Sequence, residues 1–365
     1  MKFNQDDIKH KRSHQNFSLI SAQKDATDFN SLLDYLNNYQ HELKSAITNY
    51  GAIVIRGYQV ETPEQFQQVG LSLFPNLQNQ YPGGAPRQKV AEYVWTASEL
   101  PSYLPISGHT ELSYSPSDKP THILFFCPQV AASGGETPVI DMKSVFSDLP
   151  ARLKHRCSQT CLAIKLFWVS TQKRLFDVRL WKWPWFRSPK PWQAVFNTED
   201  RDVVETKCHN AGRQVEFEWL TNGDLIASYS MPIISPHPTT KEMVWTGWFP
   251  RFHIWGCCIE AWFVSKYQGK FRSWLVFFIL FLITFVQICL EKLIPGCRKY
   301  RVLDVTFEDG SSLSVWDVYH IVKSYWQNSE LLSWQEGDIL ILDNYRMGHG
   351  RLPFTGKRRV YTAFA

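Results

Sequence analysis

Apolar residues recur along the chain with two different spacings, and these predict where helices and strands lie. Over residues 31–50 they recur every three or four positions, which is typical of one buried face of a helix. Asn30 or Ser31 can cap the start of this helix, and Gly51 ends it. A second helix is predicted to begin at Thr62-Pro63, because threonine is a good cap and proline fits the first helical position. Two more helices are predicted, over Asp141–Leu149 and Ser314–Trp326.

Short apolar runs between glycine, proline and asparagine predict strands. These runs are Ala52–Ile55, Thr121–Phe126, Thr137–Ile140, Gln214–Trp219, Asp224–Tyr229, Ile339–Leu342 and Arg358–Phe364. Thr221-Asn222-Gly223 joins the fourth run to the fifth, and Asn-Gly is among the strongest hairpin signals. Many short strands with few helices predict a mainly β fold with flanking helices, of the double-stranded β-helix or jelly-roll type.

One segment does not fit a soluble barrel. Trp274–Leu290 is a run of 17 residues without a charged side chain, which is the lower limit for crossing a membrane. It is apolar on all sides, so it is expected either in lipid or deeply buried in protein. Two interpretations stay open. One is a membrane helix, attached in plane or as a hairpin rather than as a full transmembrane span, and the other is a core helix that covers the barrel in a soluble dimer.

Composition narrows the class of protein. The chain has 365 residues, of which 44% are hydrophobic and 20% charged, so a disordered chain is excluded. Its 15 tryptophans suit a large aromatic core or a surface at a membrane interface. The eight cysteines lack paired CxxC spacing, so they are expected to be reduced in a cytoplasmic chain, with a zinc site as the weaker alternative. The polar first 16 residues resemble no secretory signal.

The net charge of +5 is unevenly distributed. Residues 151–192 hold ten Lys and Arg against one acid, and residues 266–301 hold seven against one. Both stretches are rich in aromatic residues, which favours an anionic partner surface, such as a membrane contacted through 151–192 and 262–301. A solvated basic face is the alternative for 151–192. No nucleic-acid partner is expected, and the oligomeric state stays open.

Three residues form a candidate metal site. His109 and Glu111 are two residues apart, and in an extended strand such residues point to the same face. On this pattern alone, a surface polar pair is the simpler explanation. His349, which follows a buried strand, can supply a third ligand. Two histidines and one carboxylate on one face of iron(II) leave three positions open, which a 2-oxo acid and O₂ can fill.

A 2-oxo acid co-substrate needs a cation at its far carboxylate. Arg358 and Arg359 follow on the predicted last strand, and arginine suits this role because its planar fork binds a carboxylate through two bonds. Thr137 can add a hydroxyl beside that carboxylate.

At these residues the chain resembles a known family. The stretch GHTELSYSPSDKPTHILFFCPQVAASGGETPVIDM is similar to the iron-binding segment of the taurine dioxygenase (TauD/TfdA) superfamily, in its clavaminate synthase-like and syringomycin-type amino-acid hydroxylase branch. GDILILDNYRMGHGRLPFTGKRRV is similar to that branch's distal histidine and 2-oxoglutarate arginine segment, and EFEWLTNGDL and AITNYGAIVIRGY also resemble it. The resemblance covers residues 44–364, with a gap at the apolar segment.

The resemblance implies a clavaminate synthase-like fold and a role for each matched residue. His109, Glu111 and His349 match the iron(II) ligands. Thr137 and Arg359 match the 2-oxoglutarate contacts, with Arg358 as the alternative one position away. The implied substrate contacts are Arg87, Trp95 and Thr96, and a surface salt bridge is an equal alternative for Arg87.

The chain departs from the family pattern at residues 246–253, which read TGWFPRFH. His237, before this segment, and His253, at its end, are candidate extra ligands, but turn and packing roles are favoured for both. A polar extension is expected over 1–29 and an oxygenase domain over 30–365. Within that domain, a basic aromatic lid is expected over 151–192 and an apolar insertion over 262–300.

The implied reaction is oxidative decarboxylation of 2-oxoglutarate to succinate and CO₂, coupled to oxidation of a substrate C–H bond. Related halogenases lack the carboxylate ligand, so Glu111 favours hydroxylation or desaturation. Three functions compete: an oxygenase of a small amino-acid-like or carrier-bound substrate, a membrane-associated oxygenase of a lipid or lipid-linked substrate, and a non-catalytic membrane-associated binding protein. The complete set of matched ligands argues against the third.

Overall fold

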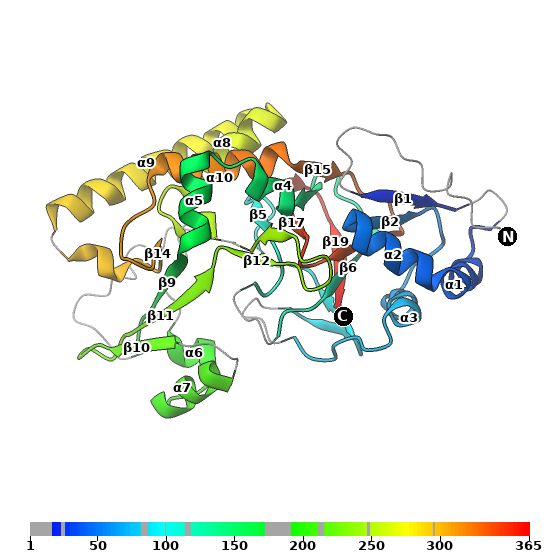
Figure 1. Ribbon diagram of the computed structural model, residues 1–365, viewed down its shortest axis with the longest axis horizontal. Coiled ribbons are helices and arrows are strands. Elements are labelled where there is room, and N and C mark those ends of the chain that lie inside the picture. The colour runs from blue at the N-terminus through cyan, green and yellow to red at the C-terminus, as the bar shows by residue number, and fades with distance from the viewer. Residues whose placement is uncertain are drawn as a thin grey trace.

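Two β-sheets lie face to face in one half of the molecule, and a third sheet with long helices forms the other half (Figure 1). The computed structural model describes residues 17–22, 26–81, 87–98, 100–113, 118–171, 191–210, 215–246, 249–294 and 296–365. Residues 1–16 of the expected polar extension and residues 172–190 of the expected lid lie outside the described residues.

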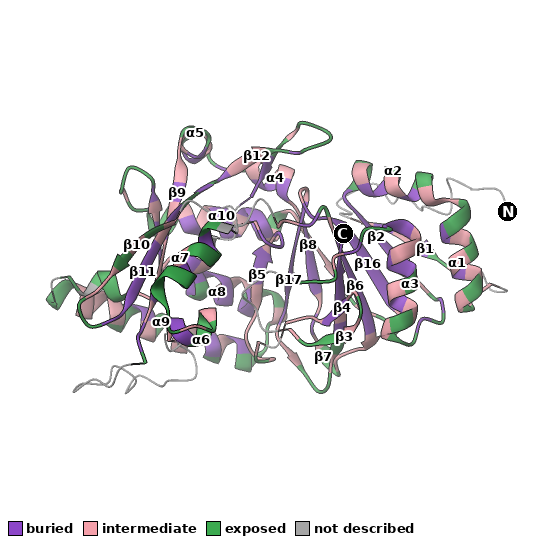
Figure 2. Cartoon of the chain, turned by 90° about the horizontal axis from the view of Figure 1, so that it is seen from below, coloured by how far each residue is buried: buried purple, intermediate pink, exposed green. Residues whose placement is uncertain are grey.

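The larger of the facing sheets has seven strands. Their order is β1 (Ser18–Ser21), β2 (Ala52–Arg56), β16 (Asp338–Asp343), β6 (His122–Gln129), β19 (Arg359–Phe364), β4 (Val94–Thr96) and β3 (Lys89–Ala91). β1 and β2 are parallel, and the other neighbours are antiparallel. Every residue of β16 is buried, because both faces of the sheet are covered (Figure 2).

The second facing sheet carries the candidate ligands. Its order is β15 (Ser329–Leu332), β8 (Thr137–Asp141), β17 (Met347–Arg351) and β5 (Ile106–His109). A short pair, β7 (Ser133–Gly134) with β18 (Phe354–Thr355), lies beside it. Phe125 and Leu340 from the large sheet pack with Val139 and Met347 from the small one in a shared core. This arrangement confirms the predicted jelly roll.

Three helices cover the outer face of the large sheet: α1 (Phe29–Asn38), α2 (Gln40–Tyr50) and α3 (Pro63–Leu73). The prediction of one helix over 31–50 is wrong, because the backbone leaves helical geometry at Tyr39, where φ is −121° and ψ is 26°. The cap is Asp28 rather than Asn30 or Ser31, and its carboxylate accepts from the Ser31 amide at 3.0 Å. α3 begins as predicted.

The other half is built on a four-stranded sheet. Its order is β10 (Val215–Trp219), β11 (Leu225–Pro232), β9 (Cys161–Trp168) and β14 (Leu303–Phe307). The predicted hairpin at Thr221–Gly223 joins β10 to β11. Helix α5 (Ala151–Gln159) and β9 occupy the first half of the expected lid, so that part belongs to a helix and a sheet.

Further elements complete this half. They are α4 (Met142–Ser147), α6 (Trp192–Phe196), α7 (Arg201–Asn210), α8 (Gly256–Gln268), α9 (Phe271–Leu293), α10 (Val315–Gln327), the short pair β12 (Ile234–Pro236) and β13 (Met243–Trp245), and the 3-10 turns η3 (Phe249–Phe252) and η4 (Cys297–Tyr300). α10 begins after Ser314, as predicted, and Ser314 caps it. Its inner face packs with α4, α8 and the β9–β14 pair in one core.

The apolar segment forms most of α9, and this helix is largely exposed. Among the described residues, α9 is the one helix long and apolar enough to cross a membrane, and only 11% of its most apolar window is buried. α9 contacts α8 along one side. The large apolar side chains that it leaves exposed are Phe271, Leu275, Phe278, Phe281, Leu282, Phe285, Val286 and Leu293. The core-helix interpretation does not hold within this single chain.

Truncation of the central strand tests how far this fold depends on β16. Ile341 is fully buried between β2 and β6. We expect Ile341→Ala to lower the free energy of unfolding by about 2–5 kcal/mol, because it removes buried methyl groups and leaves a cavity. Chemical denaturation measures this change. The control is Val203→Ala on the exposed face of α7, which should stay within about 0.5 kcal/mol.

Candidate metal centre

Two neighbouring strands bring the three candidate ligands together. β5 ends at His109, β17 carries His349, and these two residues are direct backbone partners. Glu111 follows β5 by two residues. The donor atoms of the three side chains lie within 4.8 Å of one another, and the two imidazole centroids are 4.5 Å apart. Among the described residues, this is the one group of three or more His, Cys, Asp or Glu placed to hold a metal.

The protonation of the group suits a divalent metal. His109 Nδ1 donates to the carbonyl of Ser107 at 2.9 Å, which leaves Nε2 as the ligand atom. Burial lowers the pKa of His109, and burial, His109 and Arg87 lower the pKa of His349 well below its usual value. Both imidazoles are therefore neutral near pH 7. His349 Nε2 lies 4.0 Å from Glu111 Oε2, so two nitrogens and a carboxylate fit iron(II).

The Glu111 carboxylate is held by two donors. Tyr81 donates its hydroxyl to Oε1 at 3.0 Å, and Arg87 donates to Oε2 at 3.0 Å. The Arg87 guanidinium lies over the Tyr81 ring at 4.6 Å and near the Phe364 ring at 5.4 Å. Its side chain is 8% exposed, so Arg87 forms a buried ion pair rather than a surface salt bridge. A buried cation therefore lies directly beside the candidate metal.

The other two predicted substrate contacts lie close to Arg87. Trp95 is buried and its ring tilts against Phe364 at 5.5 Å. Thr96 uses its hydroxyl to accept from the Gln88 amide at 2.9 Å, and its carbonyl lies 3.4 Å from Arg87. Trp95 thus packs on Phe364, which also lies near Arg87, whereas the Thr96 side chain fixes the neighbouring backbone.

The predicted co-substrate contacts lie on β8 and at the start of β19. The buried Thr137 hydroxyl accepts from the indole of Trp334 at 2.9 Å. Along β19, Val360 and Phe364 face the core between the sheets, and Ala363 faces the outer helices. This alternation directs position 358 inward and position 359 outward.

The two arginines differ accordingly. The Arg358 guanidinium lies 5.6 Å from the Phe354 ring, and burial lowers the pKa of Arg358 while Cys127 and Glu136 partly offset this. Arg359 is exposed and pairs with Gln129 of β6.

Three residues at or next to the site were given no role from the sequence. Tyr81 lies 30 residues before Glu111, and Asn344 lies in a turn before β17. Arg351 is buried and donates to the carbonyls of Leu100, Pro101 and Leu104 at 2.7–3.0 Å. The first two were not predicted because their partners are distant in the sequence.

The two extra histidines have packing roles. His237 Nε2 lies 2.9 Å from Asp343, and both buried side chains lie outside the group that can hold a metal. Burial lowers the pKa of His253 to about 4, and its Nδ1 accepts from the Trp255 amide at 3.3 Å. Neither residue belongs to the group that can hold a metal, which agrees with the turn and packing roles that the sequence analysis favoured for both.

Facing sheets with two histidines and one carboxylate at their edge define the class of non-haem iron(II) dioxygenases. The chain matches the model of the taurine catabolism dioxygenase TauD, TfdA family over residues 11–245 and 318–363, and it belongs to that family. It is accordingly a dioxygenase that uses iron(II), 2-oxoglutarate and O₂ on a small-molecule substrate. The match omits residues 246–317, which contain α8, α9 and β14.

Two relatives are similar over most of their length. The chain is 25% identical to the dapdiamide synthesis protein DdaC of Enterobacter agglomerans over 88% of this chain and 84% of that protein. It is also 25% identical to the clavaminate synthase-like protein At3g21360 of Arabidopsis thaliana, over 89% and 84%. The solved structure of PvcB from Pseudomonas aeruginosa has a TM-score of 0.50 at 10% identity and covers 97% of this chain and 87% of its own. At that identity the likeness shows the fold alone.

Proposed function

We propose that His109, Glu111 and His349 hold one iron(II) and that the chain hydroxylates or desaturates a small acid. The observation that carries the proposal is the cluster of three donor atoms within 4.8 Å, built from two neutral imidazoles and one carboxylate. When bound, the iron supplies the reaction of O₂ with 2-oxoglutarate, which gives succinate and CO₂ and oxidises a substrate C–H bond. Glu111 occupies the position that a halide needs, which favours hydroxylation or desaturation over halogenation.

The other residues of the site orient the reactants. We assign the far carboxylate of 2-oxoglutarate to Arg358 rather than to Arg359. Arg358 lies on the same side of the strand as Val360 and Phe364, which face the core between the sheets, whereas Arg359 is exposed. Thr137 assists at the start of β8. Tyr81 and Arg87 fix the carboxylate of Glu111 so that it does not rotate away from the metal.

The substrate proposal is an amino-acid-like molecule, free or carrier-bound, with an anionic group near Arg87. The Arg87 guanidinium already pairs with Glu111, and its several N–H donors allow it to contact an anionic group of the substrate as well. The likeness to a dapdiamide synthesis protein and to a clavaminate synthase-like protein supports this class.

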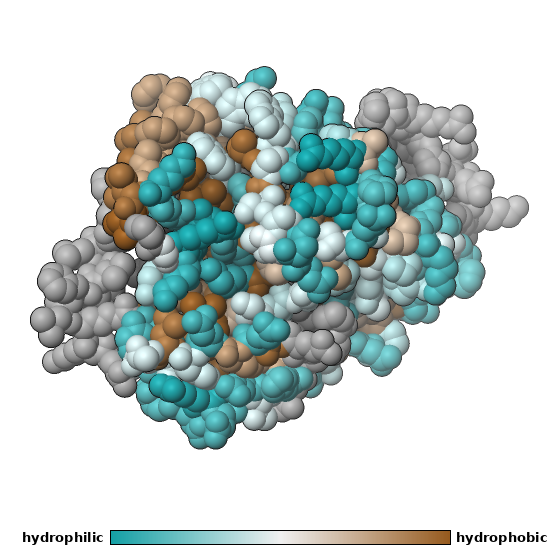
Figure 3. Space-filling view, turned by 60° about the vertical axis from the view of Figure 1, so that its left-hand side comes forward, coloured by the Kyte–Doolittle hydropathy of each residue, from teal (hydrophilic) through white to brown (hydrophobic). Residues whose placement is uncertain are grey.

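The exposed face of α9 supports a second proposal, which concerns where the enzyme acts. We infer that α9 binds an anionic membrane surface from the cytoplasmic side, which would suit a lipid or lipid-linked substrate. Figure 3 shows the apolar patch on one side of the molecule. Lys270 and Arg272 at one end of α9, and Lys292, Arg298 and Lys299 at the other, are exposed. Each such charge near an anionic leaflet contributes about 1 kcal/mol.

The iron assignment can be tested by titration under anaerobic conditions. His109→Ala removes one of three ligands, so we expect loss of stoichiometric iron(II) binding in calorimetry and loss of succinate formation. His253→Ala is the matched control, because that histidine has only a packing role. Iron binding by His109→Ala at the wild-type stoichiometry would refute the assignment.

The co-substrate assignment compares two neighbouring arginines on one strand. Removing one partner of a buried charge pair costs about 2–5 kcal/mol, which predicts that Arg358→Leu raises the 2-oxoglutarate KM about 30- to 5,000-fold. Arg359→Leu, on the exposed face, should leave KM nearly unchanged. The opposite result would assign the carboxylate to Arg359.

Vesicle sedimentation tests the membrane proposal. We expect binding to vesicles with about 30% phosphatidylserine and weaker binding to neutral vesicles. Binding should be lost in about 0.5 M salt, because salt screens the exposed charges. Phe278→Asp with Phe285→Asp should abolish binding, and the same change at exposed Val195 and Val203 should not. The proposal is wrong if the wild type fails to sediment with either vesicle. It is also wrong if light scattering shows a dimer that the Phe278→Asp, Phe285→Asp variant does not form, because α9 would then be buried in the dimer interface.

A further inference from the structure

A turn between the two facing sheets lies beside the metal group. β16 ends at Asp343, β17 begins at Met347, and the turn 344–346 joins the large sheet to the small one. Asn344 is fully buried in this turn, five residues before His349. The chain therefore passes from this asparagine directly into the strand that carries a metal ligand.

The side chain of Asn344 binds both backbone groups of Glu111. Its Oδ1 accepts from the Glu111 amide at 2.7 Å, and its Nδ2 donates to the Glu111 carbonyl at 3.0 Å. Nδ2 also donates to the carbonyl of Pro120 at 2.9 Å, and the Asn344 amide donates to Thr121 at 2.9 Å. One side chain thus ties the segment of one ligand to the turn that precedes another.

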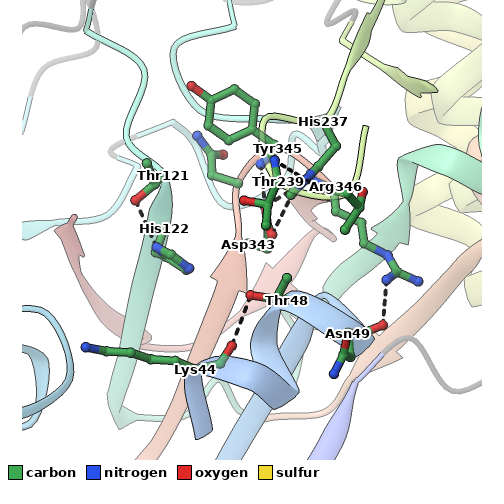
Figure 4. A network of polar contacts seen from close by, with 12 residues as sticks. Lys44, Thr48, Asn49, Thr121, His122, His237, Thr239, Asp343, Tyr345 and Arg346 are labelled. Carbon is green, nitrogen blue, oxygen red and sulfur yellow. Dashed lines mark hydrogen bonds and ion pairs between the residues drawn. The ribbon is translucent and has the colours of Figure 1, made fainter. Parts of the chain in front are cut away.

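The turn is itself held by a buried carboxylate. Asp343 Oδ1 accepts from the amides of Tyr345 and Arg346 at 2.9 and 3.2 Å. Its other oxygen, Oδ2, lies 2.9 Å from His237 Nε2 (Figure 4). Both oxygens of Asp343 therefore have partners, and the backbone that presents Asn344 is fixed from two sides.

The contacts of the other ring nitrogen of His237 show which nitrogen carries the hydrogen. The amides of Thr239 and Thr240 both donate to Nδ1, at 3.2 and 3.1 Å. Because Nδ1 accepts, Nε2 carries the hydrogen and donates to Asp343. The loop between β12 and β13 thus supports the turn through this one histidine.

We propose that Asn344 is a positioning residue for the iron carboxylate, and that His237 and Asp343 hold the turn that presents it. This inference rests on the proposed metal site. A carboxylate ligand can bind a metal well only when its backbone is fixed, and Glu111 lies after the end of β5, where no strand pairing holds it. Asn344 replaces that missing pairing with two hydrogen bonds.

An asparagine is required for this role. Aspartate would keep an acceptor for the Glu111 amide but would set a negative charge against two carbonyls, those of Glu111 and Pro120. An alanine would leave the Glu111 amide and carbonyl buried without partners, which is costly. Substitution of such outer partners of metal ligands typically weakens metal binding about 10- to 100-fold.

The test measures affinity for Mn(II) and Co(II) by calorimetry, together with the visible absorption of the Co(II) form. We expect Asn344→Asp to bind about 10- to 100-fold more weakly than the wild type and to change the Co(II) spectrum. Asn328→Asp is the matched control, because Asn328 donates to Asp148 and Ser324 at the end of α10. The control should bind metal as the wild type does, whatever its thermal stability.

A second pair of variants acts at a distance from the metal. His237→Gln retains an amide donor that can reach Asp343 and should keep an affinity close to that of the wild type. His237→Leu removes the donor and should weaken Mn(II) binding about tenfold. Wild-type affinity in folded Asn344→Asp and His237→Leu would overturn the inference while leaving the metal site intact. Failure of the wild type itself to bind metal would instead refute the proposed function.

Discussion

The backbone pairing of β17 with β5 is the interaction on which the site depends, because it sets His349 directly opposite His109. The two strands approach closely. A side chain at position 350 would place its Cβ 2.5 Å from the carbonyl oxygen of Ile106, so only glycine fits there. A register shift in the same pairing lies between His349 and Arg351. Glycine at this position thus allows the two imidazoles to meet.

The buried charges around this pairing balance one another. A carboxylate without a partner would be unstable beside two neutral imidazoles in a site shielded from water. Arg87 supplies the opposite charge, and stacking on Tyr81 holds the guanidinium in place. The same ion pair, together with the Tyr81 hydroxyl, fixes the orientation of the Glu111 carboxylate. This explains why a residue from a distant loop lies so close to the ligands.

The sequence predicted well what is encoded locally. The glycine-ended strands, the cap at Thr62 and the hairpin at Thr221–Gly223 depend on neighbouring residues, and all are present. The three ligands proposed from the two long motifs come together in one cluster, because β5 pairs with β17. The break at Tyr39 was missed, since both halves of that helix bury the same kind of apolar stripe.

Residues that act through distant partners could not be predicted in this way. Tyr81 and Asn344 meet Glu111 only after the sheets close. The inward face of β19 depends on its register against β6, which shifts between Arg359 and Tyr361. The sequence alone does not decide which of two adjacent arginines faces inward. Neighbouring residues of a strand point to opposite faces, and either Arg358 or Arg359 could be the one that faces the site.

The topology around α9 limits how this helix can contact a membrane. Along the chain, α9 comes after β13 and before β14. β14 pairs with β9 in the same sheet as β11. A single crossing would separate β14 from β9 by the thickness of a bilayer, which their hydrogen bonds forbid. Residues before and after the helix must therefore stay on one side. The membrane contact proposed for α9 would therefore run along the length of the helix on one side of the bilayer, which is compatible with both the sheet pairing and the exposed apolar side chains.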